Sequence, residues 1–112
     1  MDSTDAGGPA GDIELQIDHP RATGDNEAVV VVRCIRGPVR IGTRFYRIRN
    51  STASIDLTLT SIVFYGHSVD ELDAGHTALV TLRGPGVRAL SSADAHRWQS
   101  IQGHSAETPN PP

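Results

Sequence analysis

The side chains that could perform chemistry are few, and the first group is a run of imidazoles and carboxylates. His67, Asp70, Glu71 and His76 lie within ten residues of one another. Such side chains ligate metals when a fixed helical or zinc-finger spacing brings them to one point. These four have no such spacing, and they alternate with turn-forming residues. We therefore expect polar turn residues here, with no metal site.

Nucleophilic catalysis has no stronger candidate. Cys34, the only cysteine, lies in a valine-rich segment, where a small buried hydrophobic side chain is favoured over a reactive thiol. Arg33 is adjacent, but neighbours on a strand point to opposite faces, so it is not placed to activate the thiol. No nucleophile elbow surrounds the serines at positions 61, 68, 91 and 92. We expect no enzyme activity, no catalytic residue and no cofactor.

The best candidate for a binding site is a block of arginines. Residues 28–55 contain no acidic residue. They contain six arginines, which are Arg33, Arg36, Arg40, Arg44, Arg47 and Arg49. Guanidinium groups hold phosphate or carboxylate through paired N–H donors. If the turn at Gly37 and Pro38 lies beside the strand that follows, several of these groups converge on one surface.

The arginine block leaves two functions open. One is docking to a protein partner, or to a second copy of the chain, by a non-catalytic module with complementary acidic and basic segments. The alternative is binding of RNA or a ribonucleoprotein. A net charge of −3, a pI of about 5.9 and few aromatic residues disfavour RNA. The arginines can also pair with Glu14, Asp18 or the acidic N-terminus.

Strands must position these residues, and residues 55–84 show them best. Apolar residues alternate with polar ones from Ile55 to Leu59, which is the period of a strand with one buried face. The phase slips near Ser61, which predicts a bulge. Alternation returns from Ala78 to Leu82. A polar turn, ending at Gly75, is expected between the two strands.

The rest of the chain predicts more short strands. We expect a strand over residues 13–18 that His19-Pro20 ends, a central strand over 28–35 buried on much of both faces, and a short strand over 39–41. Residues 43–49 mix charge and apolarity on both faces, which an edge strand tolerates. A last strand over 87–90 is expected. Six or seven strands joined by Gly and Pro turns predict an all-β fold, a small closed antiparallel barrel.

The domain organisation follows from composition. Residues 12–90 are expected to form one β-barrel domain, followed by a possible short helix over 91–102. Residues 1–11 and 103–112 are predicted to be disordered tails. No apolar run approaches the roughly 20 residues that span a bilayer, and the N-terminus is acidic, unlike a secretory signal. We expect a cytoplasmic protein without a membrane partner.

Two segments carry a family resemblance. RGPVRIG at residues 36–42 resembles a turn and strand with the pattern R-G-x-V/I-K/R-V/I-G-D, and the segment from Ala74 to Gly84 resembles a later A-G-x-x-A/V-x-L/V-x-L-x-G pattern. Both belong to the second, β-barrel domain of translational GTPases such as elongation factor Tu and initiation factor 2. The resemblance covers residues 12–88. Thr43 stands where the pattern has an acidic residue, and the strand at Ala28 lacks the glycine spacing often seen there.

The resemblance implies a fold and a general role. In that family the barrel contacts the GTPase domain and, in several members, the acceptor end of aminoacyl-tRNA or ribosomal RNA. The chain contains neither the G-x-x-x-x-G-K-S/T phosphate loop nor the Asn-Lys-x-Asp guanine-reading motif, so GTP hydrolysis is not implied. No single binding residue transfers from the family. What transfers is the use of the barrel as a docking module.

Overall fold

The computed structural model describes residues 12–49, 51, 52, 54–90 and 99–104. These residues form nine strands and one short 3-10 helix, η2 (Val87–Ala89). The strands are β1 (Asp12–Thr23), β2 (Glu27–Arg36), β3 (Val39–Arg40), β4 (Arg44–Ile48), β5 (Ser54–Phe64), β6 (His67–Val69), β7 (Glu71–Leu72), β8 (Thr77–Arg83) and β9 (Gln99–His104).

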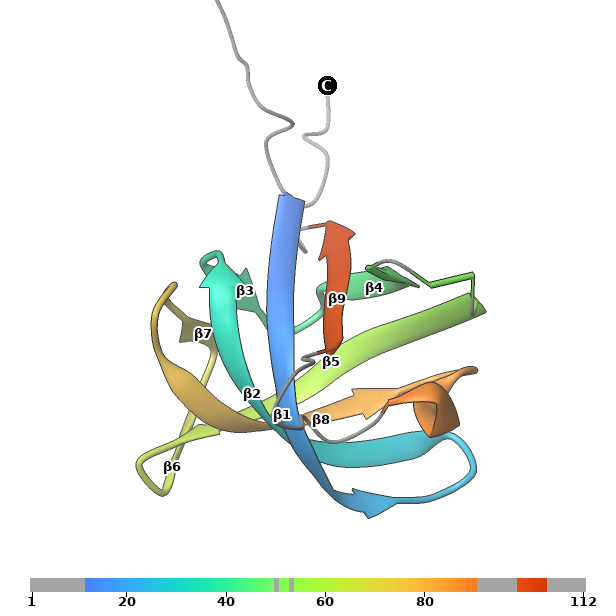
Figure 1. Cartoon of the computed structure of the whole chain (residues 1–112). Helices are drawn as coiled ribbons and strands as arrows, with labels where there is room; N and C mark the ends of the chain where they lie inside the picture. Colours follow the sequence, from blue (N-terminus) through green and yellow to red (C-terminus); the bar gives the residue numbers. More distant parts are fainter. Residues whose placement is uncertain (1–11, 50, 53, 91–98, 105–112) are drawn as a thin grey trace, which may run out of the picture.

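Six of the strands close into a barrel. Their order is β4-β9-β1-β2-β8-β5, every neighbouring pair is antiparallel, and pairing between β4 and β5 completes the circle (Figure 1). β6 extends the sheet beyond β5, and β3 pairs with β7 in a separate two-stranded sheet. The prediction of a small closed antiparallel barrel is confirmed. The segment expected as a polar turn between β5 and β8 contains the short strands β6 and β7.

The interior of the barrel is packed with apolar side chains. Alternation along each strand sends every second residue inward, as in β8, where Ala78, Val80 and Leu82 are buried. The largest fully buried side chains of the barrel strands are Leu15, Ile17, Val30, Val32, Phe45, Leu57, Leu59, Ile62, Leu82 and Ile101. β2 is central, with neighbours on both sides, and its second face is only half-buried at Val29 and Val31.

Bulges shift the inward phase where the sequence changes phase. The predicted slip in β5 is confirmed, because the register against β8 shifts between Leu59 and Ser61 and returns Ile62 to the interior. β4 contains a similar bulge. Its register shifts between Phe45 and Arg47, so Phe45 and Ile48 both point inward. β4 pairs with β5 and β9, so the expectation of an edge strand at residues 43–49 is wrong.

β1 is longer than the sequence indicates. It continues through His19 and Pro20 to Thr23, where we expected it to end at Asp18. β9 pairs with β1 only from Asp12 to Ile17, so beyond Ile17 the described part of the chain gives β1 a neighbour on one side only, β2. A proline is tolerated on such a one-sided strand because it lacks only a donor that the ladder does not require.

The expectations for the C-terminal region need correction. Residues 87–90 form η2 and its C-cap where we expected a strand, although Val87 and Leu90 are buried as a core requires. Residues 99–102, predicted as part of a helix over 91–102, belong to β9, and so do Gly103 and His104 of the expected tail. Residues 91–98 lie outside the described residues. β9 is a strand because β1 and β4 supply partners on both sides.

No helix in the described part of the chain is long and apolar enough to cross a membrane.

Gly103→Ala is expected to destabilise the barrel by about 2 kcal/mol or more. A Cβ at Gly103 would lie 2.9 Å from Cα of Phe45 and closer still to the carbonyl oxygen of Arg44, so β4 and β9 would have to separate. Urea denaturation measures the change. Gly24→Ala is the matched control, because a Cβ there meets only the carbonyl oxygen of Glu27 at 3.6 Å. Equal stability of the two variants would contradict the β4–β9 pairing.

Cys34 is expected to resist alkylation in the folded chain. Its side chain is fully buried, and burial raises its pKa to about 11, with the negative charge of Asp73 adding to the rise against a backbone hydrogen bond at Val39. Iodoacetamide at pH 8 should therefore modify the native chain at least about 100-fold more slowly than the chain in urea, because only the exposed thiolate reacts. Mass spectrometry measures both rates on the single thiol, and rapid modification of the native chain would show that β2 is misplaced.

Candidate binding face

The six predicted arginines separate into a group of five and one outlier. Arg33 and Arg36 come from β2, Arg44 and Arg47 from β4, and Arg49 directly follows β4. β4, β9, β1 and β2 are consecutive in the barrel, so these side chains lie on its outer surface around β9 and β1. In Figure 1, β9 runs between β4 and β1. We call the outward side chains of Arg33, Arg36, Arg44, Arg47 and Arg49 around Glu14 the Arg face.

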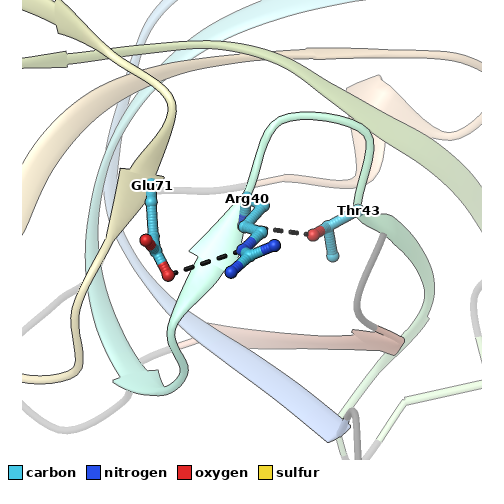
Figure 2. Close-up of polar contacts among 3 residues, drawn as sticks. All are labelled: Arg40, Thr43 and Glu71. Atoms are coloured by element: carbon cyan, nitrogen blue, oxygen red, sulfur yellow. Dashed lines mark hydrogen bonds and ion pairs between the residues drawn. The ribbon is translucent and has the colours of Figure 1, made fainter. Parts of the chain in front are cut away.

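Arg40 is the outlier, because its side chain is paired away from this face. It lies opposite Glu71 in the separate β3–β7 sheet, and its Nε is 3.5 Å from Oε2 of Glu71 (Figure 2). The backbone N–H of Arg40 donates to Oγ1 of Thr43 at 3.3 Å, and the N–H of Thr43 donates to the carbonyl oxygen of Arg40 at 3.0 Å. Thr43 is fully buried. A neutral hydroxyl thus closes this turn where the family pattern has an acidic residue, so no charge is buried there.

A row of side chains crosses four strands at the centre of the Arg face. Glu14 on β1 lies opposite Arg36 on β2 and opposite Gln102 on β9. Gln102 in turn lies opposite Arg47 on β4. Because Ile13, Leu15 and Ile101 point inward, alternation directs the row outward. Four residues that are distant in the sequence thereby become neighbours.

Glu14 is the centre of this row and is nearly buried although it faces outward. Only 7% of its side chain is exposed. Nη1 of Arg49 lies 3.3 Å from Oε2, and Nε2 of Gln102 donates to Oε1 at 3.3 Å. A carboxylate removed from water in this way needs hydrogen bonds and an opposite charge. The contact confirms that one of the arginines pairs with the first strand.

The other arginines of the Arg face differ in how they are engaged. Arg44 donates from Nη2 to both carboxylate oxygens of Asp56, at 2.7 and 2.9 Å, and this hydrogen bonding raises the pKa of Arg44. The exposed side chains of Arg33, Arg36 and Arg47 have no ion-pair partner among the described residues. The guanidinium N–H donors of these three arginines are therefore available to a ligand.

Two hydrophobic side chains lie beside the arginines of this surface, both at bulge positions. Tyr46 is the unpaired residue between Phe45 and Arg47 on β4, and it is 46% exposed. Ile35 is the corresponding residue on β2 and is 44% exposed. The only sequence signal for this exposure is that charged and apolar residues are mixed on both faces of β4. The ring centroids of Tyr46 and His104 are 4.9 Å apart, so a second side chain supports the tyrosine.

A small cleft opens in the middle of the Arg face. Its volume is about 120 Å³, and its lining includes Glu14, Arg36, Tyr46, Arg47 and Gln102. The row of side chains thus forms its floor and walls. A separate depression beside Arg33 is lined also by Gln16, Asp18 and Thr77. The cleft is where donors from two of the arginines without described partners come together.

Two of the histidines and carboxylates at positions 67–76 make side-chain contacts elsewhere. Glu71 pairs with Arg40, and the ring of His76 lies 5.1 Å from that of Phe64. Among the residues that the structure describes, no group of three or more His, Cys, Asp or Glu side chains is placed to hold a metal ion. Cys34 is buried and has a raised pKa. The Arg face is therefore the candidate site that the geometry supports.

Comparison with known proteins identifies a fold and no family. No protein-family model and no curated protein matches the chain. Among solved structures, the barrel has the fold of a domain of a translational GTPase. That protein is translation elongation factor SelB from Methanococcus maripaludis, similar in its apo form (TM-score 0.64) and in complex with the GTP analogue GppNHp (TM-score 0.65). In both cases the identity is 17%, and the match covers 83% of this chain and 19% of that one. The resemblance read from the two motifs is confirmed for the fold.

Glu14→Gln is expected to destabilise the barrel by about 1–3 kcal/mol. The amide keeps the shape but removes the charge that faces Arg49, and it adds a donor beside the Gln102 amide. Urea denaturation measures the loss. Glu27→Gln is the matched control: its pair with Arg83 is 3.7 Å long and exposed, so its loss should stay within about 0.5 kcal/mol. Equal losses would mean that Glu14 is no more important than a surface ion pair.

Proposed function

We propose that this chain is a non-catalytic binding module that docks to a protein partner through the Arg face. The observation that carries the proposal is the grouping of Arg36 and Arg47, which have no described partner, around the half-exposed ring of Tyr46. Arginine and tyrosine are enriched among the residues that dominate binding energy at protein interfaces. The bulge residue Ile35 adds apolar surface beside Arg36.

The module acts as a scaffold with a fixed surface. Its described interior is apolar, and the carboxylate at the centre of the Arg face is already held by Arg49 and Gln102. Rigid strands hold the side chains of the face in position, which limits the entropy lost on binding. Recognition is the function that such a surface serves best.

The likeness to SelB supports a role beside the translation machinery. In the SelB structures the matching region is 19% of a longer chain, so a barrel of this kind works there with other domains. We infer that this barrel likewise works next to a larger protein, in the cytoplasm, where translation takes place. The partner supplies any chemistry, and the barrel supplies position.

RNA is the second candidate, and one observation favours it. Arg33, Arg36 and Arg47 lie on the same face as the contacting, tilted rings of Tyr46 and His104, and single-stranded RNA is bound by basic grooves with aromatic platforms. Carboxylates interrupt this surface, however, at Glu14 and at Asp56. We therefore place the protein partner first.

The double variant Arg36→Gln/Arg47→Gln is expected to reduce partner capture at least about tenfold, because interface arginines are typical hot spots. The full chain is immobilised, exposed to lysate of its source organism with and without ribonuclease, and the retained proteins are quantified by mass spectrometry. Arg21→Gln/Arg83→Gln removes the same charge from exposed positions outside the cleft and is the control.

The outcomes separate the two candidates. Proteins retained by the wild type and the control after ribonuclease treatment, and lost in the Arg36/Arg47 variant, support protein docking. Retention that disappears with ribonuclease supports RNA. Equal retention by both double variants would show that the Arg face is not the docking surface, and sedimentation of the chain alone shows whether the retained partner is a second copy.

A further inference from the structure

The cleft of the Arg face has cationic side chains on opposite sides. Arg36 comes from β2 and Arg47 from β4, with β9 and β1 between them. Three strand spacings separate the two backbones by about 14 Å, which two extended arginine side chains reaching toward each other can bridge. Both line the same cleft of about 120 Å³. A group that enters it is within reach of both guanidinium forks.

The positive charges of the arginines that line this cleft exceed the negative charge that Glu14 supplies. Glu14 forms the floor, and its oxygens are taken by Arg49 and Gln102. Neither Arg36 nor Arg47 has an ion-pair partner in the described ranges. Arg36 and Arg47 thus bring two positive charges without described ion-pair partners to one small space, and an anion bound there would balance them.

The size of the cleft restricts the anion. Pockets that take drug-sized ligands or cofactors measure roughly 300–1,000 Å³, so one of about 120 Å³ suits a small group. A carboxylate presents two oxygens in the plane that a guanidinium fork matches. Tyr46, supported by the ring of His104, offers an apolar wall for the methylene groups that carry such a carboxylate.

The surroundings of the cleft favour a lone carboxylate over a run of phosphates. Asp56, held by Arg44, lies toward one end of the Arg face, and Asp18 lines the depression beside Arg33 toward the other. A polynucleotide would bring further phosphates against these acidic groups. A side chain on a folded protein brings only one charge.

We propose that the cleft between Arg36 and Arg47 binds a single carboxylate, the side chain of an aspartate or glutamate of the docked protein. This inference rests on the proposed docking function and names the chemistry that the docking surface recognises. The site is built by the fold itself, because both arginines sit on paired strands and the floor is fixed by Glu14 and Gln102.

Titration of the full chain with a blocked peptide, acetyl-Gly-Gly-Glu-Gly-Gly-amide, tests the site directly. The arginine Nε–H signals in nitrogen-correlated NMR spectra report on each guanidinium separately. Saturable shifts are expected at Arg36 and Arg47 and not at Arg21, with the glutamine form of the peptide as the matched ligand control. Arg36→Gln and Arg47→Gln should each weaken binding at least about fivefold, since each removes one fork, and backbone spectra of the variants show that they are folded.

Each remaining outcome overturns the inference. Equal shifts at Arg21 would mean unspecific charge attraction, and absence of saturable shifts at millimolar peptide would mean no site. Tighter binding of inorganic phosphate or of oligouridylate at the same two arginines would assign the cleft to phosphate. If the peptide does not bind but partner capture still depends on Arg36 and Arg47, the docking function remains supported and carboxylate recognition is ruled out. Binding of the peptide with unchanged partner capture would instead leave the cleft without its docking role.

Discussion

The pairing of β9 between β1 and β4 is the constraint on which both the barrel and the Arg face depend. Without this strand the sheet would have two open edges, at β4 and at β1. Its close approach to β4 is possible because Gly103 has no side chain where the backbone of Arg44 passes. The same strand places Gln102 between Glu14 and Arg47. Closure of the fold and assembly of the site are therefore one event.

The strands that can be predicted from the sequence are those whose own residues alternate between apolar and polar. β8 alternates strictly and β5 alternates from Ile55 to Leu59, and the phase slip in β5 is visible because Ile62 follows Leu59 by three positions. β9 is hidden because Ile101 is its only large apolar residue. It forms a strand because β1 and β4 pair with it on both sides, and pairing between distant segments leaves no local sequence signal. Pro20 misleads for the same reason: a proline ends a strand only where the ladder needs its donor.

The residue types of the candidate site are predictable from sequence, but their arrangement is not. The arginine block identifies the cations, yet Arg40 is diverted to Glu71 and Arg44 to Asp56. The residue that organises the rest, Glu14, is separated from its partner Gln102 by 88 positions. Arg47 faces outward, two positions after the buried Phe45, only because a bulge lies between them. Cross-strand register, which sequence patterns do not encode directly, decides which of these side chains meet.

A carboxylate at the centre of an arginine-rich surface changes what that surface recognises. Glu14 lowers the repulsion among the guanidinium groups, so the barrel can hold them on neighbouring strands without losing the fold. It also lowers the positive potential, which weakens the general attraction for polyanions. In the binding mode that we propose, the cleft between Arg36 and Arg47 takes one anion, with the ring of Tyr46 beside it. Selectivity of this kind arises from rejecting the wrong ligand as much as from attracting the right one, which is why we propose a folded acidic protein as the partner in preference to a nucleic acid.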